Sequence, residues 1–496
     1  MSLSLPPFLP RRLFLAPAIG AALLLAACGD GGGDGPVRVD VIGTAGQMRA
    51  PLDNGGNAAG QTLLAATAQG LVAFDAGGDL IGGLAERWIV DEGGQSYLFR
   101  LKPARWSNGD PVRAPDVARL LRDRFKANPV ILSGLDPQVR GMTDEVLEIR
   151  LPGPMPSFLQ LLAHPAIAIA RRGEGTGPFR PRPGHDVITL LPMAKAGPAA
   201  GTEGDGQGTA EQPLFLLPTR AALGFTRFER RHSDLLLGGR YQHLPYVTVT
   251  SLPNGAVRAD PVNGLFGLVI DGGPDFLAHR DMREVLGSAL DRDRLAQLLN
   301  LAGWRTATTI LPSPLDLGRA PAQPGWAGQD LAVRQDRARS VLRDWARIHG
   351  GPPPALRIAL PDGPGTRILF RSLSRDYAAI GLSTRLVAWD APADLRLIDE
   401  VAPFDSALWY LSRIGCGPNA LCSRAAEAQL GIARRAATEP ERAAALAEAE
   451  RLSLAEANYI PLGMPIRFAL VRPRLTGYQP SPRARHPLNA LFRAPR

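Results

Sequence analysis

The cysteine at position 28 is the side chain whose surroundings point most directly to a chemical reaction. It completes a Leu-Ala-Ala-Cys run at the end of an apolar stretch over residues 13–25, which follows Arg11 and Arg12. A stretch of this length is too short to span a membrane and is typical of a signal-peptide core. A leucine, two small residues and a cysteine at its end form the pattern of a bacterial lipobox, in which a diacylglyceryl group is attached to the cysteine sulfur. We therefore expect residues 1–27 to be a signal peptide and Cys28 to carry a lipid; the alternative is an ordinary cysteine in an ordinary signal peptide.

The segment that follows Cys28 is suited to hold a protein near a membrane. Residues 29–36 read Gly-Asp-Gly-Gly-Gly-Asp-Gly-Pro, a composition that forms flexible linkers. We expect residues 28–36 to be a lipidated cysteine and its tether. Arg11, Arg12, Phe14 and Leu15 also match the twin-arginine export pattern, so the sequence leaves both the general and the twin-arginine export routes open.

Two further cysteines, Cys416 and Cys422, are separated by five residues. Because the predicted signal peptide places the chain in an oxidising compartment, a disulfide that closes a small loop is favoured. A metal-binding pair is the weaker alternative, since no histidine or third cysteine stands nearby to complete a tetrahedral set.

Other reactive side chains are not arranged as in catalytic motifs. Seven histidines are scattered at positions 164, 185, 232, 243, 279, 349 and 486, without the His-Glu-x-x-His spacing of zinc hydrolases. The sequence has no Gly-x-Ser-x-Gly nucleophile turn and no phosphate-binding P-loop. We therefore predict that the protein is not an enzyme and that it has no cofactor and no metal site.

The charge pattern argues against nucleic-acid binding. The chain of 496 residues has a net charge of +9, and only Lys102, Lys126 and Lys195 of its 56 basic residues are lysines. Arginines alternate with acids, as over residues 334–344, which is typical of a solvated helix face. Hydrophobic residues form 45% and charged residues 21% of the chain. These values and the length predict a globular protein of roughly two to four domains.

Short strands alternate with helices along the rest of the sequence. Apolar spacing predicts strands over residues 37–42, 96–101, 146–151 and 356–360. Helical spacing predicts helices over residues 61–71, 114–125, 158–162, 280–300, 330–348 and 439–458, the last opened by a capping box at Thr438 and Glu441. Residues 197–212 are predicted to be a Gly-rich surface loop. This alternation predicts an α/β body with more than one lobe.

Blocks of sequence in a fixed order resemble one protein family. They are Leu-Ala-Glu-Arg-Trp at 84–88, Gly94 with Tyr97, Phe99 and Leu101, Trp-Ser-Asn-Gly at 106–109, Ala114 with Asp116 and Val117, Gly-Thr-Gly-Pro-Phe at 175–179, Val285 with Ala289, Asp291, Arg292 and Leu295, Tyr-Ile-Pro-Leu at 459–462, and Gly-Tyr at 477–478. Together these blocks resemble the extracytoplasmic solute-binding proteins, family 5, of peptide and nickel ABC importers. The resemblance covers residues 37–490. Most of the matching residues are core and turn residues, so they predict the fold better than the ligand.

The resemblance implies an α/β, two-lobed periplasmic-binding-protein-like fold of type II, with an extra subdomain and a hinge. The implied boundaries are lobe I at 37–60, 165–262 and 461–496, an inserted subdomain at 61–164, and lobe II at 263–460. The implied function is capture of a small solute or peptide-like ligand in the cleft between the lobes and delivery to an ABC permease in the inner membrane. The lipid anchor would hold the protein to the membrane on the periplasmic side of the envelope. The alternative function is that of an envelope lipoprotein that keeps this fold without a transport role.

The resemblance also implies a ligand-binding stretch. In peptide-binding members, an aspartate that lies a few residues after an aromatic residue pairs with the amino terminus of the ligand. The corresponding stretch here holds Trp409, Tyr410, Ser412 and Arg413, with Ser412 at the acidic position. A buried ammonium would therefore lack a carboxylate partner. We expect a neutral or anionic ligand with Arg413 as its partner, the alternative being a surface arginine. Trp409 and Tyr410 either stack on the ligand or fill a strand.

Overall fold

The computed structural model describes residues 35–49, 51, 57–171, 175–193, 212–416 and 421–493. The predicted signal peptide, Cys28 and most of the predicted tether lie outside these residues, as does most of the loop predicted at 197–212. All described helices and strands belong to one unit, Pro36–Ala494. Within the described ranges, no helix combines the length and the hydropathy needed to cross a membrane.

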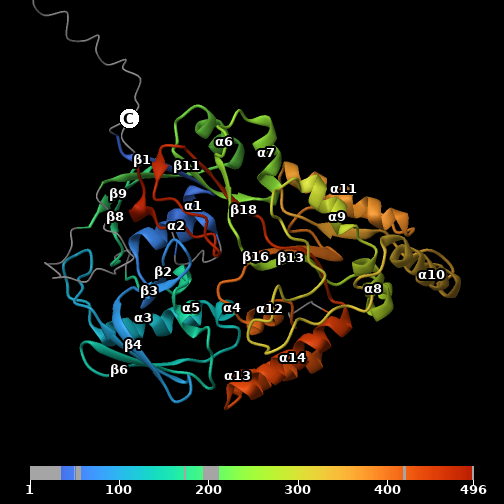
Figure 1. Ribbon diagram of the computed structural model, residues 1–496, viewed down its shortest axis with the longest axis horizontal. Helices are drawn as coiled ribbons and strands as arrows, with labels where there is room; N and C mark the ends of the chain where they lie inside the picture. The colour runs from blue at the N-terminus through green and yellow to red at the C-terminus, as the bar shows by residue number, and fades with distance from the viewer. Residues whose placement is uncertain are drawn as a thin grey trace, which may run out of the picture. The chain divides into compact units, whose positions relative to one another are not determined.

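A seven-stranded sheet is built from segments that are far apart in the sequence (Figure 1). Its central strand β1 runs parallel to both β10 and β11, and Val37, Val39 and Val41 of β1 are fully buried. The order is β12-β18-β11-β1-β10-β9-β8, with β1 at Val37–Ile42, β8 at Phe179–Pro183, β9 at Ile188–Pro192, β10 at Leu214–Thr219, β11 at Leu235–Arg240, β12 at Val257–Ala259 and β18 at Arg467–Val471. The helices near this sheet are α1 (Ala45–Arg49), α2 (Ala58–Thr67), α6 (Ala221–Glu229) and α7 (Leu244–Val249).

A second, five-stranded sheet is buried on both faces. In its strand β13, Phe266 and Leu268 belong to one hydrophobic core and Leu265 to another, as the two-residue period of a strand requires. The order is β15-β14-β16-β13-β17, with β13 at Gly264–Ile270, β14 at Leu356–Ala359, β15 at Thr384–Val387, β16 at Leu395–Val401 and β17 at Tyr459–Gly463.

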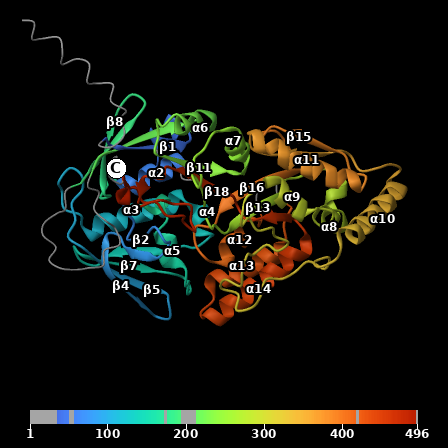
Figure 2. The same cartoon turned by 45° about the horizontal axis from the view of Figure 1, so that its top comes forward.

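Helices cover both faces of the five-stranded sheet (Figures 1 and 2). One group packs through the core that contains Phe266: α8 (Arg280–Ser288), α9 (Arg292–Leu299), α10 (Leu331–His349) and α11 (Pro364–Ala379). The other group, near the end of the chain, comprises α12 (Ala407–Arg413), α13 (Arg424–Arg435) and α14 (Glu439–Glu456). The chain passes from the first sheet to the second between β12 and β13 and returns between β17 and β18.

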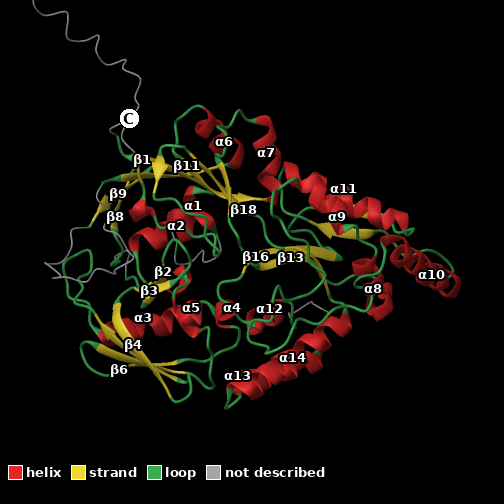
Figure 3. Ribbon diagram, in the orientation of Figure 1, coloured by secondary structure: helices red, strands yellow, loops and turns green. Residues whose placement is uncertain are grey.

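A four-stranded antiparallel sheet of order β4-β5-β7-β6 lies at the lower left in Figure 3, to the left of α12–α14. Its buried residues and those of α12–α14 form one continuous hydrophobic core. The strands are β4 (Ala85–Asp91), β5 (Ser96–Leu101), β6 (Gln138–Gly141) and β7 (Val146–Arg150), with α3 (Ala114–Ala127), α4 (Pro129–Leu132) and α5 (Phe158–Leu162) beside them. Smaller pairs are formed by β2 (Val72–Phe74) with β3 (Leu80–Gly82) and by β19 (Leu475–Thr476) with β20 (Phe492–Arg493).

Most predicted elements are found, with three differences. The predicted helix 280–300 is two helices, α8 and α9, separated at residues 289–291. The helix predicted at 61–71 ends at Thr67. The backbone after it packs closely against the backbone at Leu162, because a Cβ at Gly70 would lie only 2.6 Å from the Leu162 carbonyl oxygen. The stretch with Trp409 and Tyr410, expected as a strand, is the helix α12.

Candidate functional site

A cavity of about 790 Å³ has walls from both large sheets. Its volume is in the range of small-molecule sites. The first sheet contributes the ends of β11 and β18, the second contributes residues 396–401 of β16, and α2 contributes one helical face. The remaining walls come from residues 127–131, from α12 and the turn after it, and from residues 483–486.

The end of β11 reaches the cavity through two glycines. The pairing of β11 with β18 shifts register between Leu236 and Gly239. Gly238 has φ +88°, a conformation that favours glycine, and a Cβ at Gly239 would lie 2.5 Å from the Phe468 carbonyl oxygen. This bulge brings Arg240 into the cavity wall.

Asp399 on β16 is shared by two arginines. Arg467 Nη1 lies 2.7 Å from Asp399 Oδ1, and Arg240 Nη1 lies 3.9 Å from Asp399 Oδ2. The charge of Arg467, followed by burial, lowers the pKa of Arg240 to about 10, so Arg240 still carries its charge at neutral pH. One carboxylate therefore faces two guanidinium groups in this wall.

Arg413 lines the cavity, but it already has a partner. Its Nε and Nη2 atoms donate to the two Glu400 carboxylate oxygens at 2.7 and 2.6 Å. Both side chains are about one-third exposed. The hypothesis that Arg413 is the free partner of a ligand therefore has to account for Glu400, which sequence reasoning did not identify.

The helical form of the stretch 407–413 decides which predicted residues reach the cavity. Ser406 Oγ caps α12 by accepting from the Leu408 N–H. In a helix, residues four apart share a face, so Trp409 and Arg413 both line the cavity. Tyr410 is buried at 1% exposure and Ser412 Oγ accepts from Arg434 Nη2 at 3.2 Å; neither residue is part of the cavity wall. A serine before an apolar run is a sequence signal that predicts such a helix start, and sequence reasoning did not use it here.

Residues 483–486 form another wall that sequence reasoning missed. Arg483 Nη2 lies 2.5 Å from Asp405 Oδ2, and His486 Nε2 lies 3.3 Å from Asp260 Oδ2. Arg485 lies between them, and its Nη1 atom is buried without a hydrogen-bond partner. Burial, and to a lesser extent Arg483, lowers the pKa of Arg485 to about 9.

His164 completes this wall. Its Nδ1 accepts a hydrogen bond from the Ala166 N–H at 3.0 Å, which places the ring proton of the neutral form on Nε2. Burial and the nearby charge of Arg485 lower the pKa of His164 well below its usual value, so the ring is neutral at pH 7.

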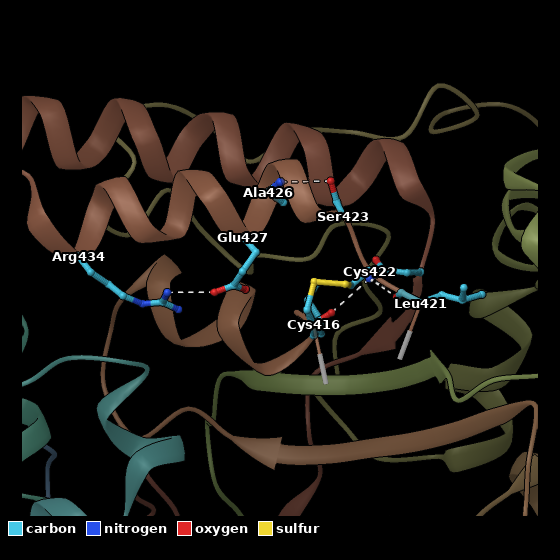
Figure 4. The surroundings of a disulfide bond; sticks show 9 residues. Cys416, Leu421, Cys422, Ser423, Ala426, Glu427 and Arg434 are labelled. Atoms are coloured by element: carbon cyan, nitrogen blue, oxygen red, sulfur yellow. Dashed lines mark hydrogen bonds and ion pairs between the residues drawn. A yellow bond between two sulfur atoms is a disulfide. The ribbon is translucent and has the colours of Figure 1, made fainter. Parts of the chain in front are cut away.

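Cys416 and Cys422 are joined by a disulfide next to the cavity (Figure 4). Asn458 Nδ2 donates to the Ile414 and Leu421 carbonyl oxygens at 3.2 and 3.0 Å, so it ties together the two arms of this loop. Gly415 and Leu421 line the cavity. Among the residues described here, no group of three or more histidine, cysteine, aspartate or glutamate side chains is placed to hold a metal ion.

Comparisons with known proteins agree with the resemblance seen in the sequence. Residues 79–198 match the model of the bacterial extracellular solute-binding proteins, family 5. Over 314 residues, the chain is 30% identical to the probable deoxycholate-binding periplasmic protein YgiS of Escherichia coli, covering 55% of this chain and 57% of the relative. It is also 30% identical over 314 residues to the periplasmic oligopeptide-binding protein OppA of Salmonella typhimurium, covering 56% of each. The chain thus matches little more than half of the length of these curated relatives.

The fold extends the likeness to almost the whole chain. The crystal structure of Haemophilus influenzae OppA in complex with the peptide RPPGFSPFR superposes with a TM-score of 0.74 and 16% identity, covering 93% of this chain and 99% of that one. The predicted α/β periplasmic-binding-protein-like fold is therefore confirmed. The match over residues 79–198 and the shared fold make this chain similar to the bacterial extracellular solute-binding proteins, family 5.

Proposed function

We propose that the protein is the solute-binding lipoprotein of an ABC importer of the peptide and nickel class. It captures a solute in the cavity between the two large sheets and delivers it to a permease in the inner membrane, without catalysing a reaction. The observation that carries this proposal is the cavity of about 790 Å³ whose walls come from both sheets. The periplasmic location named for the two relatives supports a place on the periplasmic side of the envelope.

The cavity is better suited to a neutral or anionic ligand than to a free amino terminus. Three acidic residues line it, and each already has a partner: Asp260 contacts His486, Asp399 pairs with Arg467, and Glu400 pairs with Arg413. A ligand ammonium would have to displace one of these pairs to find a carboxylate. The two relatives, named for deoxycholate and for oligopeptides, show that such chains are associated with unlike ligands.

The proposal is tested by a ligand screen on the soluble chain from Val37 onward. The panel holds peptides, oligosaccharides, organic anions and metal chelates, and the measurement is thermal unfolding. A ligand at a hundredfold excess over its Kd adds about 2.7 kcal/mol of stability. A shift with any panel class supports solute capture. No shift with any class would contradict it and favour an envelope lipoprotein without a transport role.

The proposed anchor is tested separately. Replacing Cys28→Ser removes the thiol that the lipid needs, so we expect the protein to leave the membrane fraction. The double variant Cys416→Ser/Cys422→Ser is the control, because it removes the other two thiols and leaves Cys28 in place. Retention of the Cys28→Ser protein in the membrane fraction would contradict the anchor.

A further inference from the structure

We propose that the cavity recognises a carboxylate of its ligand through Arg485 and His164, which makes organic anions the ligand class. This inference rests on the proposed function, because it concerns the same cavity. It assigns the recognition of negative charge to residues other than Arg413.

The first step is the pairing of the arginines that line the cavity. Among the described residues, six arginines do so: Arg240, Arg396, Arg413, Arg467, Arg483 and Arg485. Four carboxylates face the first five: Asp399 faces both Arg240 and Arg467, Asp271 faces Arg396, Glu400 faces Arg413, and Asp405 faces Arg483. Asp260 also lines the cavity, beside His486, so six guanidinium groups stand against five carboxylates and leave an excess of one positive charge in the wall.

The second step is the position of Arg485. In the described part of the chain, no hydrogen bond or ion pair engages its side chain, although its neighbour Arg483 has Asp405, the Ala402 carbonyl oxygen and Gln160 as partners. Placing a guanidinium where it is partly buried and unpaired costs free energy. Its pKa of about 9 leaves it charged at neutral pH. A ligand anion would supply the missing partner.

The third step is the hydrogen-bonding character of Arg485 and of His164. His164 has its Nδ1 engaged by the Ala166 N–H, so its remaining ring nitrogen is a donor. Arg485 has donors only. Both residues line the cavity, and the charge of Arg485 acts on His164. Two such donor groups match the two oxygens of a carboxylate and leave an amide nitrogen without a partner.

The test uses matched acids and amides as probes on the full chain, purified in a non-ionic detergent. The panel contains N-acetylated dipeptides and tripeptides, each as the free acid and as the C-terminal amide, and simple aliphatic and aromatic carboxylic acids with their primary amides. We expect wild-type protein to bind acids more tightly than the amides by about tenfold or more, as charge-assisted hydrogen bonds allow. This preference should vanish in Arg485→Gln and persist in Arg343→Gln, which removes an exposed arginine of α10.

A second measurement separates ligand recognition from a structural role. Because Arg485 is unpaired, Arg485→Met should leave the melting temperature of the ligand-free protein unchanged or raise it, whereas Arg483→Met should lower it. A large loss of ligand-free stability in Arg485→Met would overturn the inference, as would equal binding of acids and amides or an acid preference that survives Arg485→Gln. Failure of every acid to bind would also overturn it, and the wider screen would then decide on solute capture independently.

Discussion

At the scale of single residues, the pair Arg413–Glu400 separates two accounts of ligand binding. If Arg485 recognises the anion, Arg413 acts only through the charge balance of the wall. Arg413→Gln then leaves Glu400 unpaired at the cavity and weakens acid binding several-fold, whereas Glu400→Gln strengthens it. The double variant should return to near wild-type affinity. Titration of an acid identified in the panel measures all four proteins.

Direct recognition by Arg413 gives a different pattern, since the double variant would bind as weakly as Arg413→Gln. The effect on stability is small in either case. Both side chains are about one-third exposed, and such pairs contribute about 1 kcal/mol or less. Urea unfolding of Arg413→Gln checks this limit and guards against reading a folding defect as a binding defect.

Residue types and spacing alone did not identify Arg485 because the chain offers many arginines and few signals to rank them. Arg413 was selected because it follows an aromatic pair in a stretch that resembles a binding segment. Its partner Glu400 precedes it by 13 residues and belongs to another element, β16, so no local pattern joins them. The state of a guanidinium depends on which carboxylates the fold brings near it, and that information is tertiary.

At the scale of elements, α12 is held in place by a buried charge network. The Asp316 carboxylate accepts hydrogen bonds from the Ala407 N–H at 2.7 Å and from Ser406 Oγ at 2.6 Å. Arg442 of α14 donates to Asp316 at 2.8 Å and to Ser406 Oγ at 3.0 Å. The Arg442 and Asp316 side chains are 3% and 13% exposed. The network therefore fixes the start of the helix that carries Trp409 into the cavity wall.

Arg442→Met should destabilise the protein strongly. The change leaves the Asp316 carboxylate buried without its cation, which costs about 3 to 5 kcal/mol. Arg451→Met is the matched control, because Arg451 lies on the same helix and forms an exposed pair with Glu448; we expect a loss of about 1 kcal/mol or less there. Urea unfolding measures both, and equal losses would show that the buried network does not stabilise the fold.

The disulfide loop allows a second prediction at this scale. The two cysteines are six positions apart, and closing so short a loop stabilises the folded chain by about 2 kcal/mol in the chain-entropy model. Cys416→Ser/Cys422→Ser should lower the free energy of unfolding by that amount and weaken ligand binding, because Gly415 and Leu421 line the cavity. Treatment of the wild-type protein with a reductant should reproduce both effects and leave the double variant unchanged. A reductant effect on the double variant would point to another cause.

Helices and strands were predictable from the sequence where residues within the element itself determine its conformation. β1 and β5 have the predicted bounds, because alternating or β-branched apolar residues favour a strand with one buried face. The start of α14 is also local: Thr438 Oγ1 accepts from the Glu441 N–H, but the Glu441 carboxylate accepts from Ala437 N–H, so only half of the predicted capping box forms. Trp409 and Tyr410 were expected to stack on a ligand or to fill a strand, but they lie in the helix α12, whose start is held by Asp316.

At the scale of the whole molecule, the cavity is a product of topology. Residues from positions 58 to 486 form its walls, and the chain passes from one large sheet to the other at only a few points. The family resemblance predicted the fold through core and turn residues, which repeat among proteins with unlike ligands. It could not predict the charges of the wall, because these residues are individually unremarkable in sequence and acquire a role only when distant strands are assembled.

Two histidines buried in this assembly predict a dependence of stability on pH. Burial lowers the pKa of His243 to about 4. It also lowers the pKa of His164 well below the usual value of 6.5. The unfolded chain therefore binds protons on these rings at a higher pH than the folded chain does. As the pH falls from 7 to 5, each ring lowers the free energy of unfolding with a limiting slope of about 1.4 kcal/mol per pH unit.

The test compares urea unfolding of the wild-type protein and of His243→Asn between pH 7 and pH 5. This window lies above the usual titration of carboxylates, and Asn can still accept the hydrogen bond that the Arg240 N–H donates to His243 Nδ1. His185, which is exposed beside Asp186 and has a raised pKa, is common to both proteins and cancels in the difference. We expect the variant to lose less stability on acidification, by about 1 to 2 kcal/mol at pH 5. Equal pH slopes for the two proteins would mean that His243 is protonated as readily in the folded chain as in the unfolded one.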